Sequence, residues 1–118
     1  HLEGPLSAAR AALFQDAAIA PQGAPVCEVI TVAKRDLTAG ETLDGMGGFL
    51  SYGVIDNADT CRREKLLPMG LSEYCVLRRD IQKDAPLTFD DVEMPAERTI
   101  DRLWAEQRRQ FEKEPTVA

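Results

Sequence analysis

The spacing of apolar residues changes along the chain from a helical period to short strand-like runs and back again. Over 5–15 and over 98–111, apolar side chains recur every three or four positions, which is typical of amphipathic helices. Between these segments, runs rich in β-branched and aromatic residues predict strands. These runs are 26–33, 49–55 and 74–79.

Prolines and glycines divide this pattern into parts. The six residues 20–25 contain two prolines and one glycine, which predicts a linker. A short helix is expected over 58–67, because Asn57 can cap its start and Pro68 ends it. Thr88 can cap a single turn further along the chain. The predicted organisation is an N-terminal helix and linker over 1–25, a β domain over 26–96, and a C-terminal amphipathic helix and tail over 97–118.

Composition narrows the class of protein. The chain has 118 residues, of which 44% are hydrophobic, and its 14 basic and 20 acidic side chains give a net charge of −6. This length suits one compact domain. The acidic balance argues against nucleic acid as a partner, since phosphate binding needs a basic face. No apolar run approaches the ~18 residues of a membrane span, so no membrane partner is expected.

Cysteine and histidine usage excludes several chemistries. Cys27, Cys61 and Cys75 form no C-x-x-C pair, and the only histidine is His1. Neither a four-ligand zinc site nor a histidine-activated nucleophile can be assembled from them, so we expect no metal site and no catalytic residues. Unpaired cysteines favour a reducing compartment. No signal peptide is recognisable, and the expected location is therefore the cytoplasm.

An internal repeat is visible at an offset of 44 residues. Residues 32–43 and 76–87 are identical at four of twelve positions, and each copy contains a strand, a basic pair, an aspartate-led turn and an apolar residue. Asp36 and Asp80 are expected to hydrogen-bond the backbone of their own turns. The repeat predicts two interlocked β-arms. Residues expected to take the permissive backbone angle are Gly40 and Asp84, and those expected to return to the core are Leu43 and Leu87.

The residues of this repeat resemble a known domain family. The segment 33–37, followed by Gly40 and Leu43, resembles the opening of the SAF domain, and 79–81 with 87–92 resembles its closing half. The family is named for sialic acid synthases, antifreeze proteins and flagellar assembly proteins. The resemblance implies a mainly β fold, a β-clip (SAF-like) with pseudo-repeated β-arms over 26–96, flanked by an N-terminal and a C-terminal α-helix.

A longer resemblance covers nearly the whole chain. Five segments are similar, in this order, to the C-terminal part of bacterial NAD(P)-dependent homoserine-dehydrogenase-like oxidoreductases; they are 7–14, 19–21, 32–37, 44–48 and 66–71. These enzymes carry an N-terminal NAD(P)-binding Rossmann domain, a central domain and a SAF-like domain, and some relatives act as a deoxyxylulose-phosphate reductoisomerase. The resemblance implies a domain cut from such an enzyme, with the missing Rossmann and central domains as partners and a homo-oligomer possible.

The sequence lacks the motif with which these enzymes bind NAD(P). The chain contains no G-x-G-x-x-G followed by a helix, so the family's NAD(P) fingerprint has no position to map onto. The resemblance therefore implies NAD(P) for the parent protein, but no cofactor-binding and no catalytic residue in this fragment.

Two basic pairs, Lys34-Arg35 and Arg78-Arg79, are the first candidates for a binding site. If the fold brings the pairs together, they could hold a carboxylate or a phosphate, the arginines bidentately. If it does not, each pair is expected to pair locally with the aspartate that follows it. Local pairing is the favoured interpretation.

Two further features are candidates for ligand or partner contacts. The glycine-rich segment 44–48 could cradle a phosphate through backbone N–H groups, although a tight turn is the favoured interpretation. Trp104 could pack on the β domain or dock on a missing domain or second subunit. The full set of candidate ligand or interface residues is Lys34, Arg35, Asp36, Gly45, Gly47, Gly48, Arg78, Arg79 and Trp104.

The expected function follows from the resemblance. We expect a non-catalytic C-terminal domain of an NAD(P)-dependent homoserine-dehydrogenase-like oxidoreductase, completing the substrate region or a subunit interface. The alternative is a free-standing module of the SAF type that binds a sugar acid or another small anion. A flagellar-type assembly chaperone is a third hypothesis, disfavoured by the missing signal peptide and the unpaired cysteines.

Overall fold

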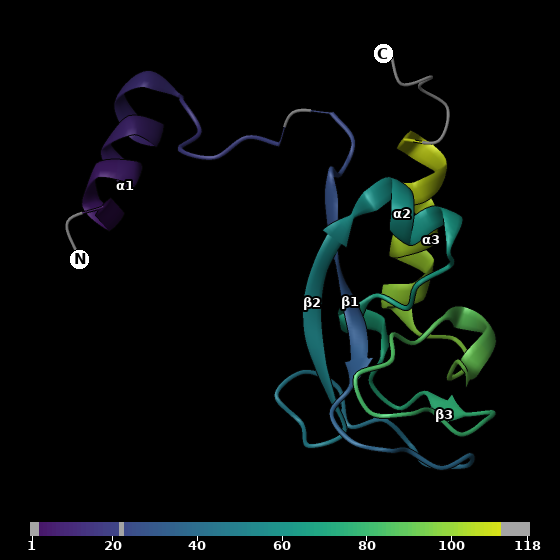
Figure 1. The fold of residues 1–118 in the computed structure, drawn as a ribbon. Coiled ribbons are helices and arrows are strands. Elements are labelled where there is room, and N and C mark those ends of the chain that lie inside the picture. Colours follow the sequence, from purple (N-terminus) through teal and green to yellow (C-terminus); the bar gives the residue numbers. More distant parts are fainter. Residues whose placement is uncertain (1–2, 22, 112–118) are drawn as a thin grey trace.

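The computed structural model of the protein describes residues 3–21 and 23–111 (Figure 1). The elements in chain order are helix α1 (Glu3–Phe14), strands β1 (Cys27–Ala33) and β2 (Ser51–Asn57), helix α2 (Ala58–Arg63), the 3₁₀ turn η1 (Met69–Leu71), strand β3 (Val76–Leu77), the 3₁₀ turn η2 (Phe89–Asp91), strand β4 (Val92–Glu93) and helix α3 (Thr99–Phe111). None of the described helices is both long and apolar enough to cross a membrane.

The expectation of a mainly β fold of the SAF-like β-clip type is wrong. The described part is mixed α/β, with 34% helix, 23% strand and two separate two-stranded antiparallel sheets, β1–β2 and β3–β4. Strand content is low because the arms turn after a few residues, so the strand expected over 74–79 is only the two-residue β3. The two helices expected at the ends are present and supply most of the helix.

Helix α2 ends earlier than expected. It stops at Arg63, and Lys65 adopts a left-handed backbone conformation with φ of 54°, a common way for a helix to end. Residues 66 and 67, predicted to lie in the helix, instead run in an extended path beside β1, where the Leu67 carbonyl accepts a hydrogen bond from the Thr31 N–H. Asn57 occupies the cap position, but its side chain makes no capping hydrogen bond.

Three extended segments close a ring of backbone hydrogen bonds in the interior. Thr31 in β1 donates its N–H to the carbonyl of Leu67 at 2.9 Å, and Leu67 donates to Leu87 at 2.8 Å. Leu87 then donates to Thr31 at 2.9 Å, which completes the circuit. All three residues are buried. The ring therefore satisfies backbone groups that no water reaches.

The internal repeat is confirmed by the hydrogen bonds, which come in pairs related by the offset of 44. Leu37 and Ile81 exchange both of their backbone bonds, at 2.8 and 2.9 Å, and so lie at the centre of the pseudo-twofold arrangement. Gly40 and Asp84 occupy equivalent turns and both have positive φ, at 90° and 63°, as predicted.

The two aspartates of the repeat act differently from the prediction. Asp36 accepts a hydrogen bond at 2.8 Å from the backbone N–H of Lys83, which belongs to the other arm. Asp80 accepts a bond of the same length from the N–H of Ala39, again in the other arm. Each carboxylate therefore fixes the opposite turn rather than its own, and the two arms are tied together at their tips.

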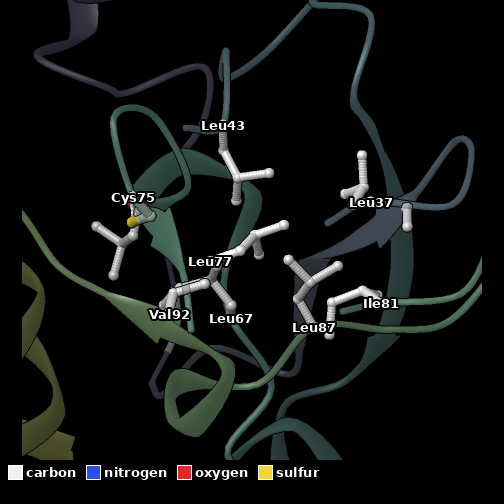
Figure 2. Packing of buried hydrophobic residues seen from close by; sticks show 10 residues of the cluster. Leu37, Leu43, Leu67, Cys75, Leu77, Ile81, Leu87 and Val92 are labelled. Carbon is white, nitrogen blue, oxygen red and sulfur yellow. Dashed lines mark hydrogen bonds between the residues drawn. The ribbon is translucent and has the colours of Figure 1, made fainter. Parts of the chain in front are cut away.

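The main core lies between the arms (Figure 2). Figure 2 shows side chains from both arms converging, among them Leu43 and Leu87, which are buried as predicted. The buried members of this cluster are Ala33, Leu37, Leu43, Leu67, Leu71, Cys75, Leu77, Ile81, Leu87 and Val92. Because each arm supplies part of one core, neither arm can pack without the other.

The two terminal helices differ in their contacts with this body: α3 packs on it and α1 does not. Arg98, just before α3, donates hydrogen bonds to the carbonyls of Glu73 and Leu71, and Trp104 of α3 packs on the Phe89 ring at 5.2 Å between centroids. Helix α1 lies apart from the rest of the molecule (Figure 1), and all of its described residues are exposed.

Candidate functional site

The first basic pair is engaged by the chain itself. Lys34 donates through Nζ to the carbonyl of Gly48 at 2.5 Å. Arg35 forms an ion pair of 2.5 Å with Glu41 and also donates to the carbonyl of Asp36. The hydrogen bond between Arg35 and Glu41 raises the pKa of the arginine and lowers the pKa of the glutamate. The predicted local pairing is therefore present, but with Glu41 rather than with the Asp36 carboxylate.

The second basic pair is held by a different segment. Arg79 forms an ion pair with Asp91, whose side chain is buried. Burial alone would raise the pKa of Asp91, but hydrogen bonds from Thr88 and Arg79 outweigh it and hold that pKa below its usual value. Arg78 is exposed, and its backbone N–H bonds the carbonyl of Asp91. Lys34, Arg35 and Arg79 are thus bonded by different segments of the chain, which favours the local-pairing interpretation.

The glycine-rich segment 44–48 closes around its own carboxylate. Asp44 accepts hydrogen bonds from the backbone N–H groups of Phe49, at 2.5 Å, and Leu50, at 3.3 Å. A Cβ atom on Gly48 would overlap that carboxyl group, and Gly45 and Gly47 have positive φ of 73° and 76°. The Asp44 carboxylate therefore occupies the position that a bound phosphate would need, which favours the turn interpretation.

The described residues give little support for a nucleophilic thiol or for a metal site. Burial is the main cause that raises the pKa of the Cys61 and Cys75 thiols, so both stay protonated near neutral pH. Cys27 is exposed at the start of β1. Within residues 3–21 and 23–111, no group of three or more histidine, cysteine or carboxylate side chains is placed to hold a metal ion.

A cavity beside Trp104 was not predicted from the sequence. It has a volume of about 280 Å³ and lies between α2, α3 and the start of β1. Its apolar lining consists of Pro25, Ala58, Cys61, Leu66, Pro68, Phe89, Trp104 and Phe111, and its polar lining of Glu28, Arg62, Lys65, Gln107 and Arg108. A signal was available, because 58, 61, 62 and 65 share one helical face and 104, 107, 108 and 111 share another.

A second, shallower hollow of about 370 Å³ continues along α3 on the other side of Trp104. It is bordered by Ile100 and Leu103, which are 46% and 55% exposed. Trp104 itself is half-buried against Phe89, and the Arg108 guanidinium carbon lies 4.9 Å from its ring centroid. Of the two roles expected for Trp104, the structure shows packing on the body. Its neighbours on the helix, Ile100 and Leu103, form an exposed apolar stripe.

The outer edge of β2 is also without a partner strand among the described residues. Thr31, directly opposite Gly53, uses its N–H and carbonyl for Leu67 and Leu87. Because alternate residues of a strand point their backbone groups in opposite directions, Gly53 and Ile55 direct theirs to the open edge. Ile55 is 70% exposed there. Sheets commonly block such edges with lysine or proline, and β2 contains neither.

No protein-family model matches the chain. No curated protein matches it either. Function is therefore inferred from the geometry described above together with the resemblance carried by the sequence.

Proposed function

We propose that this chain is a non-catalytic C-terminal domain of an NAD(P)-dependent, homoserine-dehydrogenase-like oxidoreductase, and that it contributes an interface to the other domains or to a second subunit. The observation that carries the proposal is helix α1. Leu6, Leu13 and Phe14 of this helix are 61%, 74% and 75% exposed, and no residue of α1 is buried. An isolated helix of 12 residues is marginal in water, so a partner surface is expected to stabilise it.

The open edge of β2 supports the same proposal from an independent element. Figure 1 shows β2 on the side of the body that faces α1. A neighbouring domain seated in this space would cover the apolar side chains of α1 and could pair with the backbone groups of Gly53 and Ile55. In this proposal NAD(P) binds in the Rossmann domain of the larger enzyme and not in this chain.

The state of the charged residues supports a non-catalytic role. Lys34, Arg35 and Arg79 are each bonded within the fold, and the Asp44 carboxylate fills the glycine-rich turn. The alternative of a sugar-acid or anion module at the two basic pairs is weakened by the same bonds. Nothing observed favours a flagellar-type chaperone.

The first test is to read the gene upstream of the His1 codon. The proposal expects an open frame that continues back through a central domain to a strand, a glycine-rich turn and a helix. A start codon at or near His1 would contradict it and would leave a free-standing module.

The second test uses the encoded upstream part, produced separately and mixed with this chain. Hydrogen exchange should slow at 6–14 and 53–57 on mixing, because those amides become covered. Amides of the arms around Leu37 and Ile81 serve as the internal control and should not change. Unchanged exchange at both surfaces would contradict the interface role even if the gene is continuous.

A further inference from the structure

The cavity between α2, α3 and β1 has the walls of a site for an apolar molecule. Phe89 and Trp104 line it with rings inclined by 41°, and buried Ala58, Cys61 and Leu66 line it from the α2 side. Small-molecule sites are typically concave and mostly apolar, with a few polar groups that fix orientation. The volume of about 280 Å³ is just below the usual range of such sites, about 300–1,000 Å³, which suits one small molecule.

Positive charge gathers at this cavity although the chain as a whole is acidic. Arg62, Lys65 and Arg108 line it together with one acidic residue, Glu28. Among the side chains that line the cavity, three cations therefore stand against one carboxylate, and the carboxylates of Asp59 and Asp90 pair with two of these cations from outside the lining. A carboxylate on a ligand would find charge-assisted hydrogen bonds here.

Two of these cations can turn toward a ligand at little cost. Arg62 pairs with Asp59 and Lys65 with Asp90, and the two carboxylates are 76% and 75% exposed. Exposed ion pairs of this kind contribute only about 0–1 kcal/mol. Exchanging the water-exposed aspartate for a ligand carboxylate against an apolar wall therefore requires no rearrangement of the fold.

Covalent chemistry is not expected in this cavity. Burial is the main cause that raises the pKa of the Cys61 thiol, and the negative charges of Asp56 and Glu28 add to it. A protonated thiol is a poor nucleophile and a good apolar wall.

We propose that this cavity is a binding site for a small monocarboxylate with an apolar ring or branched body. The body lies beside Trp104 and Phe89, and the carboxylate lies near Arg62 and Lys65. The inference does not depend on the proposed function, because the site is formed by this chain alone.

The test uses Trp104, the only tryptophan of the chain, as the reporter. Cyclohexanecarboxylate is titrated into the isotope-labelled protein while the Trp104 indole N–H and the Cys61 and Leu66 amides are followed by NMR. We expect saturable shifts with a dissociation constant of about 1 mM or tighter. The neutral analogue cyclohexanecarboxamide should bind at least about threefold more weakly, and acetate should cause no comparable shift, since the site needs both charge and apolar body.

Paired variants separate the carboxylate contact from general charge. Arg62→Gln with Lys65→Gln should weaken cyclohexanecarboxylate about three- to tenfold and leave the carboxamide unchanged. Arg63→Gln with Lys83→Gln removes the same charge from exposed residues that do not line the cavity, and should bind as the parent protein does. Equal weakening in both double variants would overturn the proposed carboxylate contact.

A third variant tests the location. Ala58→Met fills the cavity and should abolish shifts from both probes, provided that its NMR spectrum shows the native fold. Undiminished binding by folded Ala58→Met would overturn the site, as would the absence of any saturable shift at about 10 mM probe in the parent protein. Shifts of the Trp104 signal with protein concentration alone would also overturn it, since they would identify a second copy as the occupant. If Ala58→Met does not fold, the pair of double variants decides.

Discussion

Arg98 joins α3 to the body, and its replacement should release the helix. The side chain is 17% exposed and donates to the carbonyls of Glu73, at 2.6 Å, and Leu71, at 2.9 Å. It also binds both carboxylate oxygens of Asp101 at 2.7 Å each. Arg98→Met keeps the length of the stem and removes all four contacts.

The expected loss can be worked from these contacts. A hydrogen bond to a charged group contributes about 1.5–3 kcal/mol, but the freed carbonyls and Asp101 recover part of this from water. A net loss of about 2–3 kcal/mol is therefore expected. With a urea dependence of about 1.5 kcal/mol/M, the unfolding midpoint should fall by about 1.3–2 M.

The assay is urea unfolding followed by Trp104 fluorescence, which reports on α3, and by far-ultraviolet circular dichroism, which reports on the whole fold. In Arg98→Met the fluorescence transition should come first, because the helix detaches before the arms unfold. Arg102→Met, an exposed position on the same helix, is the control and should stay within about 0.5 kcal/mol of the parent protein. An Arg98→Met midpoint inside that same margin would refute the account of how α3 is attached.

Three further predictions concern the arms. Asp36→Ala and Asp80→Ala should each lower the free energy of unfolding by about 1 kcal/mol, and to a similar extent, since each removes one cross-arm bond; urea unfolding checks this, and a large asymmetry would contradict equivalent roles. Gly48→Ala should cost about 1–3 kcal/mol because its Cβ overlaps the Asp44 carboxyl group, and Asp44→Ala in the same chain should recover part of the loss. Asp91→Asn should be destabilising at pH 7. The folded-state pKa of Asp91 lies below its usual 3.8, so the ionised group stabilises the fold above that pH, and the difference between the two proteins should shrink as pH falls below 3.8; a difference that grows toward acid would contradict this sign.

Local pattern predicted much of this structure. The helical period at both ends, the strand beginning near residue 26 and the turn capped by Thr88 all depend on residues close together in sequence. The offset of 44 also predicted equivalent turns at Gly40 and Asp84, because turn chemistry is local.

Features that depend on contacts between residues far apart in sequence were not predicted. Asp36 and Asp80 could have bonded either turn, and only the interlocking of the arms places each beside the other's backbone. The mainly β expectation failed because bridges between arms extend over too few residues to form long strands. The cavity beside Trp104 arises where two helices far apart in sequence face each other; the sequence shows the face of each helix but not that the two faces meet.

The ring formed by Thr31, Leu67 and Leu87 has a consequence for how the chain reaches its native state. Its three members are separated by 36 and then 20 residues, so every bond of the ring joins segments distant in sequence. Such long-range closure slows folding relative to helices and hairpins, because chain entropy is lost before the contacts form. During synthesis, β1 and β2 can pair as soon as both have emerged. The ring that contains Thr31 and Leu67, however, cannot close until residue 87 has been synthesised. The interior therefore folds cooperatively only when nearly the whole domain has been made.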